Sequence, residues 1–181
     1  MQNSIDAAFL AELRAATERR WAEAEPDPRV SGFQFARGTR WLPGLSEEGL
    51  RDLEEAYGLR LPDDARLFYS VLDGTEPDAV NLYAGRQSPA RRPGVYSFPR
   101  DVKTVRAIIA EWDELHADIA ACLSDEGLEL GGEARLLPLY GHRALVCGGP
   151  GEGTVASIQP GDSVVYAPDL RGWLTWELLR G

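Results

Sequence analysis

The chain has 181 residues, of which 44% are hydrophobic, and its formal net charge is −10. These values are typical of one folded domain, and they argue against a disordered chain. The excess of Asp and Glu also argues against nucleic acid or an anionic membrane as a partner, because both bind clustered Lys and Arg.

The first 43 residues are predicted to form a helix and an arm that pack on the rest of the domain. A helix capped by Ser4 and running to about Ala24 is indicated by apolar residues at helical spacing. Residues 25–43 are expected to be irregular. Their aromatic side chains should pack against the domain: Phe33, Phe35 and Trp41.

Two short helices are predicted next, each with recognisable end signals. Ser46 can cap the first helix, and Gly58 can end it in the left-handed conformation. Pro62 suits the first turn of the second helix, and Asp73-Gly74 is expected to close it.

The pattern then changes to short strands and one long helix. Strands are expected at 80–83 and 94–98, on either side of a loop rich in Pro and Arg. From Asp101 to Leu123, apolar residues alternate steps of three and four, which predicts one long amphipathic helix ending near Gly127.

The C-terminal third is predicted to be rich in strands. The candidate strands are 135–140, 143–147, 155–158 and 164–166. Residues 148–153 form a turn, and Asp169 can cap a last helix. The economical arrangement is an α+β domain with helices packed on one face of a mainly antiparallel sheet.

Two sets of residues follow a common pattern. The first, between Gly44 and Gly74, combines a capped helix, Leu53-Glu54, Gly58, Leu61-Pro62 and a second helix. The second comprises 138–146, 155–158 and 162–166. Together they resemble the SUKH superfamily, which contains the yeast cell-wall assembly regulator and many bacterial immunity proteins.

This resemblance covers about residues 44 to 179 and divides the chain into an arm (1–43) and a SUKH-like α+β domain (44–181). It implies a domain without known catalytic residues and without a cofactor. Bacterial members are thought to neutralise cognate toxins by direct binding, whereas fungal members act as regulatory interaction proteins. A partner does not follow from the fold alone.

Histidine and cysteine chemistry is not favoured by the spacing. His142 and Cys147 would point to opposite faces of a regular strand, so we expect two structural residues rather than a catalytic dyad. No CxxC or HxxxH spacing predicts a metal site. The glycine-rich residues 148–153 lack the features of a phosphate loop, and they suit a hairpin turn.

Charge is segregated along the chain. Between 111 and 133 there are eight acids and no Lys or Arg: Glu111, Asp113, Glu114, Asp118, Asp125, Glu126, Glu129 and Glu133. Between 86 and 106 there are six bases against Asp101 alone: Arg86, Arg91, Arg92, Arg100, Lys103 and Arg106.

Glu111, Glu114 and Asp118 recur at steps of three and four, so we expect one exposed acidic ridge on the long helix. Such a ridge could steer a basic partner, and the alternative is a solvated face that aids solubility. Asp63, Asp64 and Asp73 are further candidates for partner binding, although Asp63 and Asp64 also complement a helix dipole.

These observations favour a non-catalytic protein-binding module, above all an immunity protein that binds and blocks a bacterial toxin. The toxin is expected to have a basic surface. The first alternative is a regulatory or scaffold protein. The second is a small-molecule-binding protein or hydrolase that uses His142. The oligomeric state is left open.

The compartment is predicted from what the sequence lacks. The first residues have no basic flank followed by an apolar core, and no apolar run approaches the ~20 residues that span a bilayer. Two cysteines, Cys122 and Cys147, are too few for a disulfide framework. We therefore expect a cytoplasmic protein.

Overall fold

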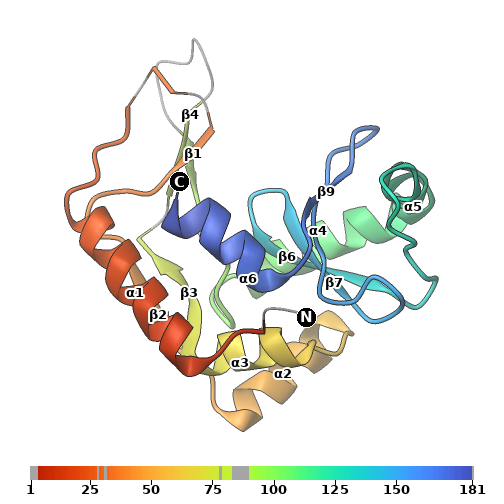
Figure 1. Ribbon diagram of the computed structural model, residues 1–181, viewed down its shortest axis with the longest axis horizontal. Helices are drawn as coiled ribbons and strands as arrows, with labels where there is room; N and C mark the ends of the chain where they lie inside the picture. Colours follow the sequence, from red (N-terminus) through yellow and green to blue (C-terminus); the bar gives the residue numbers. More distant parts are fainter. Residues whose placement is uncertain (1–3, 28, 31, 78, 83–89, 181) are drawn as a thin grey trace.

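The computed structural model describes residues 4–180, except for 28, 31, 78 and 83–89 (Figure 1). The elements in chain order are α1 (Ala7–Ala22), β1 (Gly32–Gln34), β2 (Arg40–Pro43), α2 (Glu47–Tyr57), α3 (Asp63–Val71), β3 (Leu72–Glu76), β4 (Ala79–Leu82), β5 (Ala90–Arg92), α4 (Val102–Glu114), α5 (His116–Asp125), β6 (Arg135–Tyr140), β7 (Arg143–Cys147), β8 (Val155–Ser157), β9 (Val164–Ala167), α6 (Leu170–Trp173) and the π-helix η1 (Leu174–Leu179).

The strands pair antiparallel in every described sheet. The central sheet has the order β6-β7-β8-β9, so each strand pairs with its neighbour in sequence. Smaller sheets are formed by β2 with β3 and by β1, β4 and β5. The predicted bounds of β6 and β7 are confirmed, and β8 and β9 each differ from prediction by one residue at the C-terminal end.

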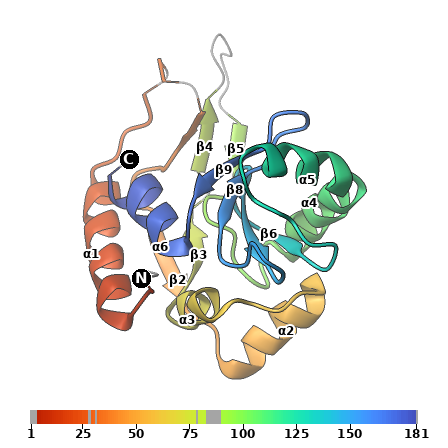
Figure 2. The same cartoon turned by 45° about the vertical axis from the view of Figure 1, so that its right-hand side comes forward.

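The central sheet buries apolar side chains on both faces, because successive residues of a strand point to opposite sides. Leu136 and Val146 belong to a smaller apolar cluster, which α4 and α5 complete. Leu137 and Leu145 belong to a larger cluster, which includes residues of α1, α2, α3 and α6. Helices therefore lie on both sides of the sheet (Figure 2). The α+β prediction is confirmed, whereas the prediction that helices cover only one face is wrong.

Residues 4–43 share the larger apolar cluster with the rest of the chain. Leu10, Leu13 and Trp21 of α1 are buried in it. Trp41 of β2 is also buried, and its indole Nε1 donates a hydrogen bond of 2.9 Å to Thr17 Oγ1. The N-terminal arm is therefore part of one domain core, and residues 25–43 contain two short strands where irregular structure was predicted.

Helix ends follow local capping chemistry. Ser46 Oγ accepts a hydrogen bond from Gly49 N, and Asp169 Oδ1 accepts one from Gly172 N, so both predicted caps are confirmed. Gly58 ends α2 with a φ of 64°, as expected for a left-handed C-cap. The first helix differs, because Asp6 rather than Ser4 provides its side-chain cap.

The predicted long helix is two helices, α4 and α5, with Leu115 between them. Leu115 has φ −96° and ψ 8°, and the chain changes direction there (Figure 1). As a result α4 packs on β6, whereas α5 reaches β9 at the other edge of the sheet. The apolar period continues through the break because Trp112 and Ile119 both enter the smaller cluster.

Residues 72–98 differ most from prediction. Asp73-Gly74 does not close a helix but lies within β3, which follows α3 directly. The predicted strand 94–98 forms only an isolated bridge from Val95 to Tyr140, and β5 lies in the predicted loop. The predicted strand 80–83 corresponds to β4, although Tyr83 lies outside the described residues, as does Arg86.

Candidate functional site

The segment formed by α4, α5 and the connection to β6 carries eight exposed carboxylates. They are Glu111, Asp113, Glu114, Asp118, Asp125, Glu126, Glu129 and Glu133. Among the described residues, none of the eight forms an ion pair within 4.0 Å. We call this set the α4–α5 acidic surface, and it is an uncompensated negative region.

The three ridge residues are exposed as expected, but they do not lie on one helix. Glu111 and Glu114 are neighbours on α4, three residues apart. Asp118 lies on α5, after the break at Leu115. The continuous ridge is therefore replaced by a broader surface that spans two helices.

A rigid base supports this surface. Trp112, Ile119 and Leu123 are buried beneath it and contact the central sheet through the smaller apolar cluster. Because these side chains fix both helices, the five carboxylates on α4 and α5 project from ordered positions, whereas Glu126, Glu129 and Glu133 lie in the connection to β6.

Asp63 and Asp64 occupy the first turn of α3. Asp63 is exposed, whereas Asp64 Oδ1 accepts a hydrogen bond of 3.2 Å from Ile5 N. Both border a cavity of about 310 Å³ that Glu152 and Asp169 also line. Asp63 is accessible to a partner, while Asp64 already connects α3 to the N-terminal residues.

Asp73 is not part of any surface. Its side chain is 3% exposed, and it accepts hydrogen bonds from Ser97 Oγ (2.9 Å) and Phe98 N (3.0 Å). Burial raises the pKa of Asp73 above its ordinary value, although these two hydrogen bonds oppose that shift. Asp73, a predicted partner-binding residue, is therefore not accessible at the surface, because its carboxylate joins β3 to the segment before α4.

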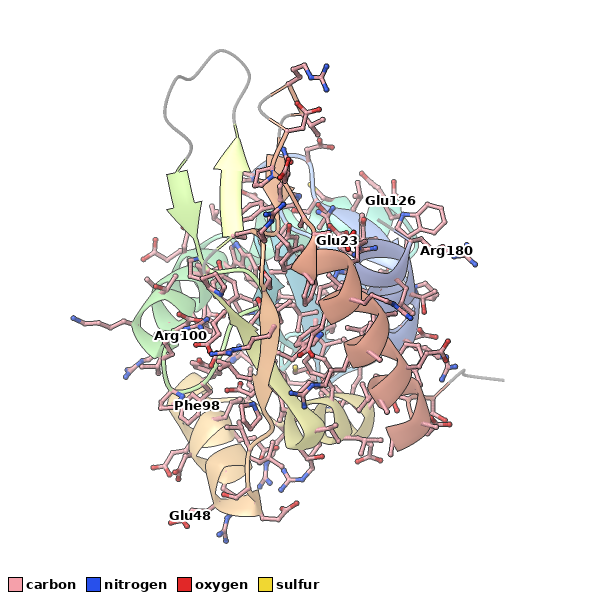
Figure 3. All side chains as sticks on the ribbon, turned by 90° about the vertical axis from the view of Figure 1, so that its left-hand side faces the viewer. Glu23, Glu48, Phe98, Arg100, Glu126 and Arg180 are labelled. Carbon is pink, nitrogen blue, oxygen red and sulfur yellow. The ribbon has the colours of Figure 1, made fainter. Side chains whose placement is uncertain are left out.

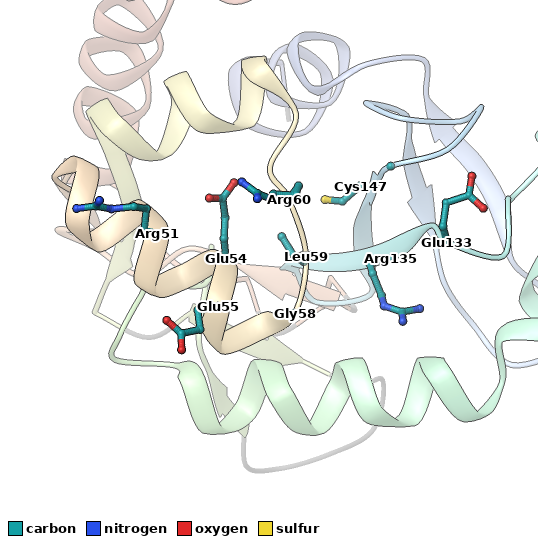
Figure 4. A pocket seen from close by; sticks show the side chains of 10 residues that line it. Arg51, Glu54, Glu55, Gly58, Leu59, Arg60, Glu133, Arg135 and Cys147 are labelled. Atoms are coloured by element: carbon teal, nitrogen blue, oxygen red, sulfur yellow. The ribbon is translucent and has the colours of Figure 1, made fainter.

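A cavity of about 680 Å³ lies between the C-terminal end of α2, the start of β6 and the end of β7 (Figure 4). Arginines and glutamates line it together: Arg51, Glu54, Glu55, Arg60, Glu133 and Arg135. Cys147 also lines it, but the residue is 3% exposed and burial raises the pKa of its thiol. A protonated thiol of this kind is a poor nucleophile.

His142 lies in a network of side chains at the turn between β6 and β7. Arg143 Nη1 donates hydrogen bonds to His142 Nε2 and, at 3.0 Å, to Ser157 Oγ. The Arg143 guanidinium stacks 3.7 Å above the Tyr166 ring, and Tyr166 donates a hydrogen bond to Glu177. Burial, followed by the charge of Arg143, lowers the pKa of His142.

This geometry does not provide a hydrolase dyad. His142 precedes β7 and Cys147 ends it, so the two side chains lie at opposite ends of one strand. The imidazole Nε2 is occupied by Arg143, and Ser157 Oγ accepts from the same guanidinium. Within the described part of the chain, no three His, Cys, Asp or Glu side chains gather in a way that could hold a metal ion.

Two adjoining cavities open beside this network. One has a volume of about 480 Å³ and the other about 190 Å³. Phe33, Tyr140 and Glu177 border both. The sequence did not indicate these cavities, because their walls come from residues more than a hundred positions apart.

Comparison with known proteins adds no relative: no protein-family model matches the chain, and no curated protein matches it. No helix among the described residues has the length and apolar character needed to cross a membrane.

Proposed function

We propose that the chain is a non-catalytic protein-binding module of the SUKH type, and that it is an immunity protein. It binds a basic toxin domain through the α4–α5 acidic surface and blocks that domain by covering it. The observation that carries the proposal is the set of eight exposed carboxylates without an ion-pair partner in the described structure.

The physical argument for a partner is the energetic cost of this surface. Like charges three or four residues apart on a helix repel each other by a few tenths of a kcal/mol, so the pair Glu111 and Glu114 on α4 lowers the stability of the free domain by about that amount. A basic partner removes the repulsion and gains long-range attraction, which raises the association rate. A helix platform packed on a sheet supports such a surface better than a mobile loop would.

The test is an affinity pull-down of tagged protein from a lysate of its own organism, at low and moderate salt, with mass spectrometry as the readout. We expect one dominant basic protein that moderate salt releases. The variant Glu111→Lys/Glu114→Lys/Asp118→Lys should lose this protein and stay folded.

A matched control reverses three exposed carboxylates elsewhere: Glu12→Lys/Asp52→Lys/Asp162→Lys. This control has the same net charge as the test variant and should retain the partner. Equal retention by both variants would refute the role of the acidic surface. Retention of several cell-wall or signalling proteins, instead of one basic protein, would support the regulatory function.

A further inference from the structure

Four aromatic side chains form a continuous row beside the larger of the two cavities near His142. Ring centroids lie 4.4 Å apart for Trp21 and Phe35, 5.6 Å for Phe35 and Tyr140, and 4.9 Å for Tyr140 and Phe33. Phe33 and Phe35 are only partly buried, and all four residues line the cavity of about 480 Å³. Trp21 and Tyr140 are only 1% and 6% exposed, so Phe33 and Phe35 present most of the aromatic surface to the cavity.

Carboxylates stand around the same space. Glu177 of η1 lines both cavities, and its side chain is 19% exposed. Its Oε2 accepts a hydrogen bond from Tyr166 and lies 3.5 Å from Arg143 Nε, while its Oε1 has no hydrogen bond to any described residue. Glu23 lies at the C-terminal end of α1, where the helix dipole adds partial negative charge (Figure 3).

Two other polar residues that line the cavity already form hydrogen bonds within the protein. Arg20 directs Nη2 to Leu178 O (2.5 Å) and Nη1 to Leu179 O (3.3 Å). The side-chain amide of Gln34 bonds to the backbone of Asp27 and Val30. The groups that a ligand meets are therefore chiefly ring faces and carboxylate oxygens.

We propose that this cavity receives an arginine side chain of the basic partner protein. Ring faces attract cations, and a planar guanidinium can stack on them while it donates to Glu177. A neutral apolar side chain would leave Glu177 Oε1 without a hydrogen bond, and an acidic side chain would be repelled by Glu177 and Glu23. This inference rests on the proposed function for the identity of the ligand, but the cavity lies apart from the α4–α5 acidic surface.

The probe is N-acetyl-arginine amide, titrated into the isolated full chain. N-acetyl-citrulline amide serves as the matched control, since it has nearly the same shape and no charge. The readout is the NMR resonance of the Trp21 indole N–H, in the wall of the cavity. We expect saturable binding of the arginine probe and at least about tenfold weaker binding of citrulline.

Equal binding of the two probes, or no saturable shift with either, would overturn the proposal. Glu177→Gln and Phe33→Leu should each lower the affinity for the arginine probe, the first by about tenfold. Glu23→Gln is a second test of the carboxylates that leaves the Arg143 network intact. Trp176→Ala is the control, because this exposed tryptophan lines neither cavity, and it should leave the affinity unchanged.

These outcomes are independent of the pull-down. Reversal of Glu111, Glu114 and Asp118 should leave the affinity for the arginine probe unchanged. If the probe binds while the acidic surface proves irrelevant, the cavity is supported and the toxin-binding proposal fails. If the partner binds through the acidic surface but the probe does not bind, only the cavity proposal fails.

Discussion

Charges are arranged in opposite ways in two regions of the molecule. In residues 14–76, six of the thirteen carboxylates form close ion pairs with an arginine, with N···O distances from 2.7 to 3.2 Å. These pairs are Arg14–Glu18, Arg29–Asp27, Arg37–Glu25, Arg40–Glu76, Arg66–Glu47 and Arg66–Glu54. In the α4–α5 acidic surface, no such pair occurs among the described residues.

The difference separates charges that act within the domain from charges that are available to a partner. Exposed ion pairs contribute about 0–1 kcal/mol each to the free energy of unfolding, so the charges of the first region stabilise the domain slightly. In the second region, repulsion between neighbouring carboxylates lowers the stability of the domain, and no close ion pair among the described residues offsets it. Four predictions test this separation, beginning with the largest effect.

Asp73→Ala should lower the free energy of unfolding by about 3 kcal/mol, because it leaves the buried hydroxyl of Ser97 and the partly buried N–H of Phe98 without their acceptor. Urea denaturation measures this change. The control Asp63→Ala, at an exposed position in the first turn of α3, should cost less than about 1 kcal/mol. Similar losses for the two variants would contradict the distinction between internal and exposed carboxylates.

Charge reversal at Glu111, Glu114 and Asp118 should slow association with the partner about tenfold or more at low salt. The dissociation rate should change less, since steering acts mainly on the encounter. Stopped-flow or surface-based kinetics would show the wild-type rate falling with salt towards that of the variant. A rate insensitive to both salt and charge reversal would count against steering.

Neutral substitutions should affect stability with opposite signs in the two regions. Glu111→Gln/Glu114→Gln should raise the free energy of unfolding by a few tenths of a kcal/mol, because it removes repulsion. Glu76→Gln should lower it by up to about 1 kcal/mol, because it removes the negative charge of the ion pair with Arg40. A loss of stability in the first variant would show that its carboxylates are paired after all.

The smallest effect concerns His142 and pH. Its pKa is lowered in the folded state by burial and then by Arg143, so the unfolded chain binds a proton more readily. Stability should be fully present above the unfolded pKa of about 6.5 and should decline as pH falls below it. His142→Gln should reduce that slope in urea unfolding measured across this range, and an unchanged slope would assign it to other groups.

Local signals in the sequence predicted the elements that local chemistry determines. Ser46, Gly58 and Asp169 mark helix ends because their capping contacts reach only three or four residues along the chain. The strands β6 and β7 were also predicted with their observed bounds, because each combines apolar residues with clear turn signals.

Tertiary packing decides the features that the sequence did not predict. The apolar period passes through Leu115 without a breaker, so only the path across the sheet explains why the helix divides there. The sequence Asp73-Gly74 is typical of a turn, and it therefore predicted the end of a helix. In the structure, a Cβ at Gly74 would lie 2.6 Å from Ser97 Cβ, so this glycine allows β3 to pack closely against the segment before α4.

The candidate sites also divide into one that local sequence predicted and one that only tertiary packing creates. The exposed acids were predicted from composition alone, because a run without Lys or Arg has no local means of neutralisation. The aromatic cavity joins Trp21, Phe33, Tyr140 and Glu177, and no spacing rule relates such distant positions.

The two faces of the central sheet support the domain through different apolar clusters, which α4 joins because Val105 and Ile109 belong to the larger cluster and Trp112 to the smaller. The acidic surface rests on the smaller apolar cluster, and the aromatic cavity belongs to the larger one. Substitutions in separate clusters usually have additive effects on stability. The helices that carry the acidic surface could therefore diverge to follow a changing partner, while the packing around the cavity is left as it is.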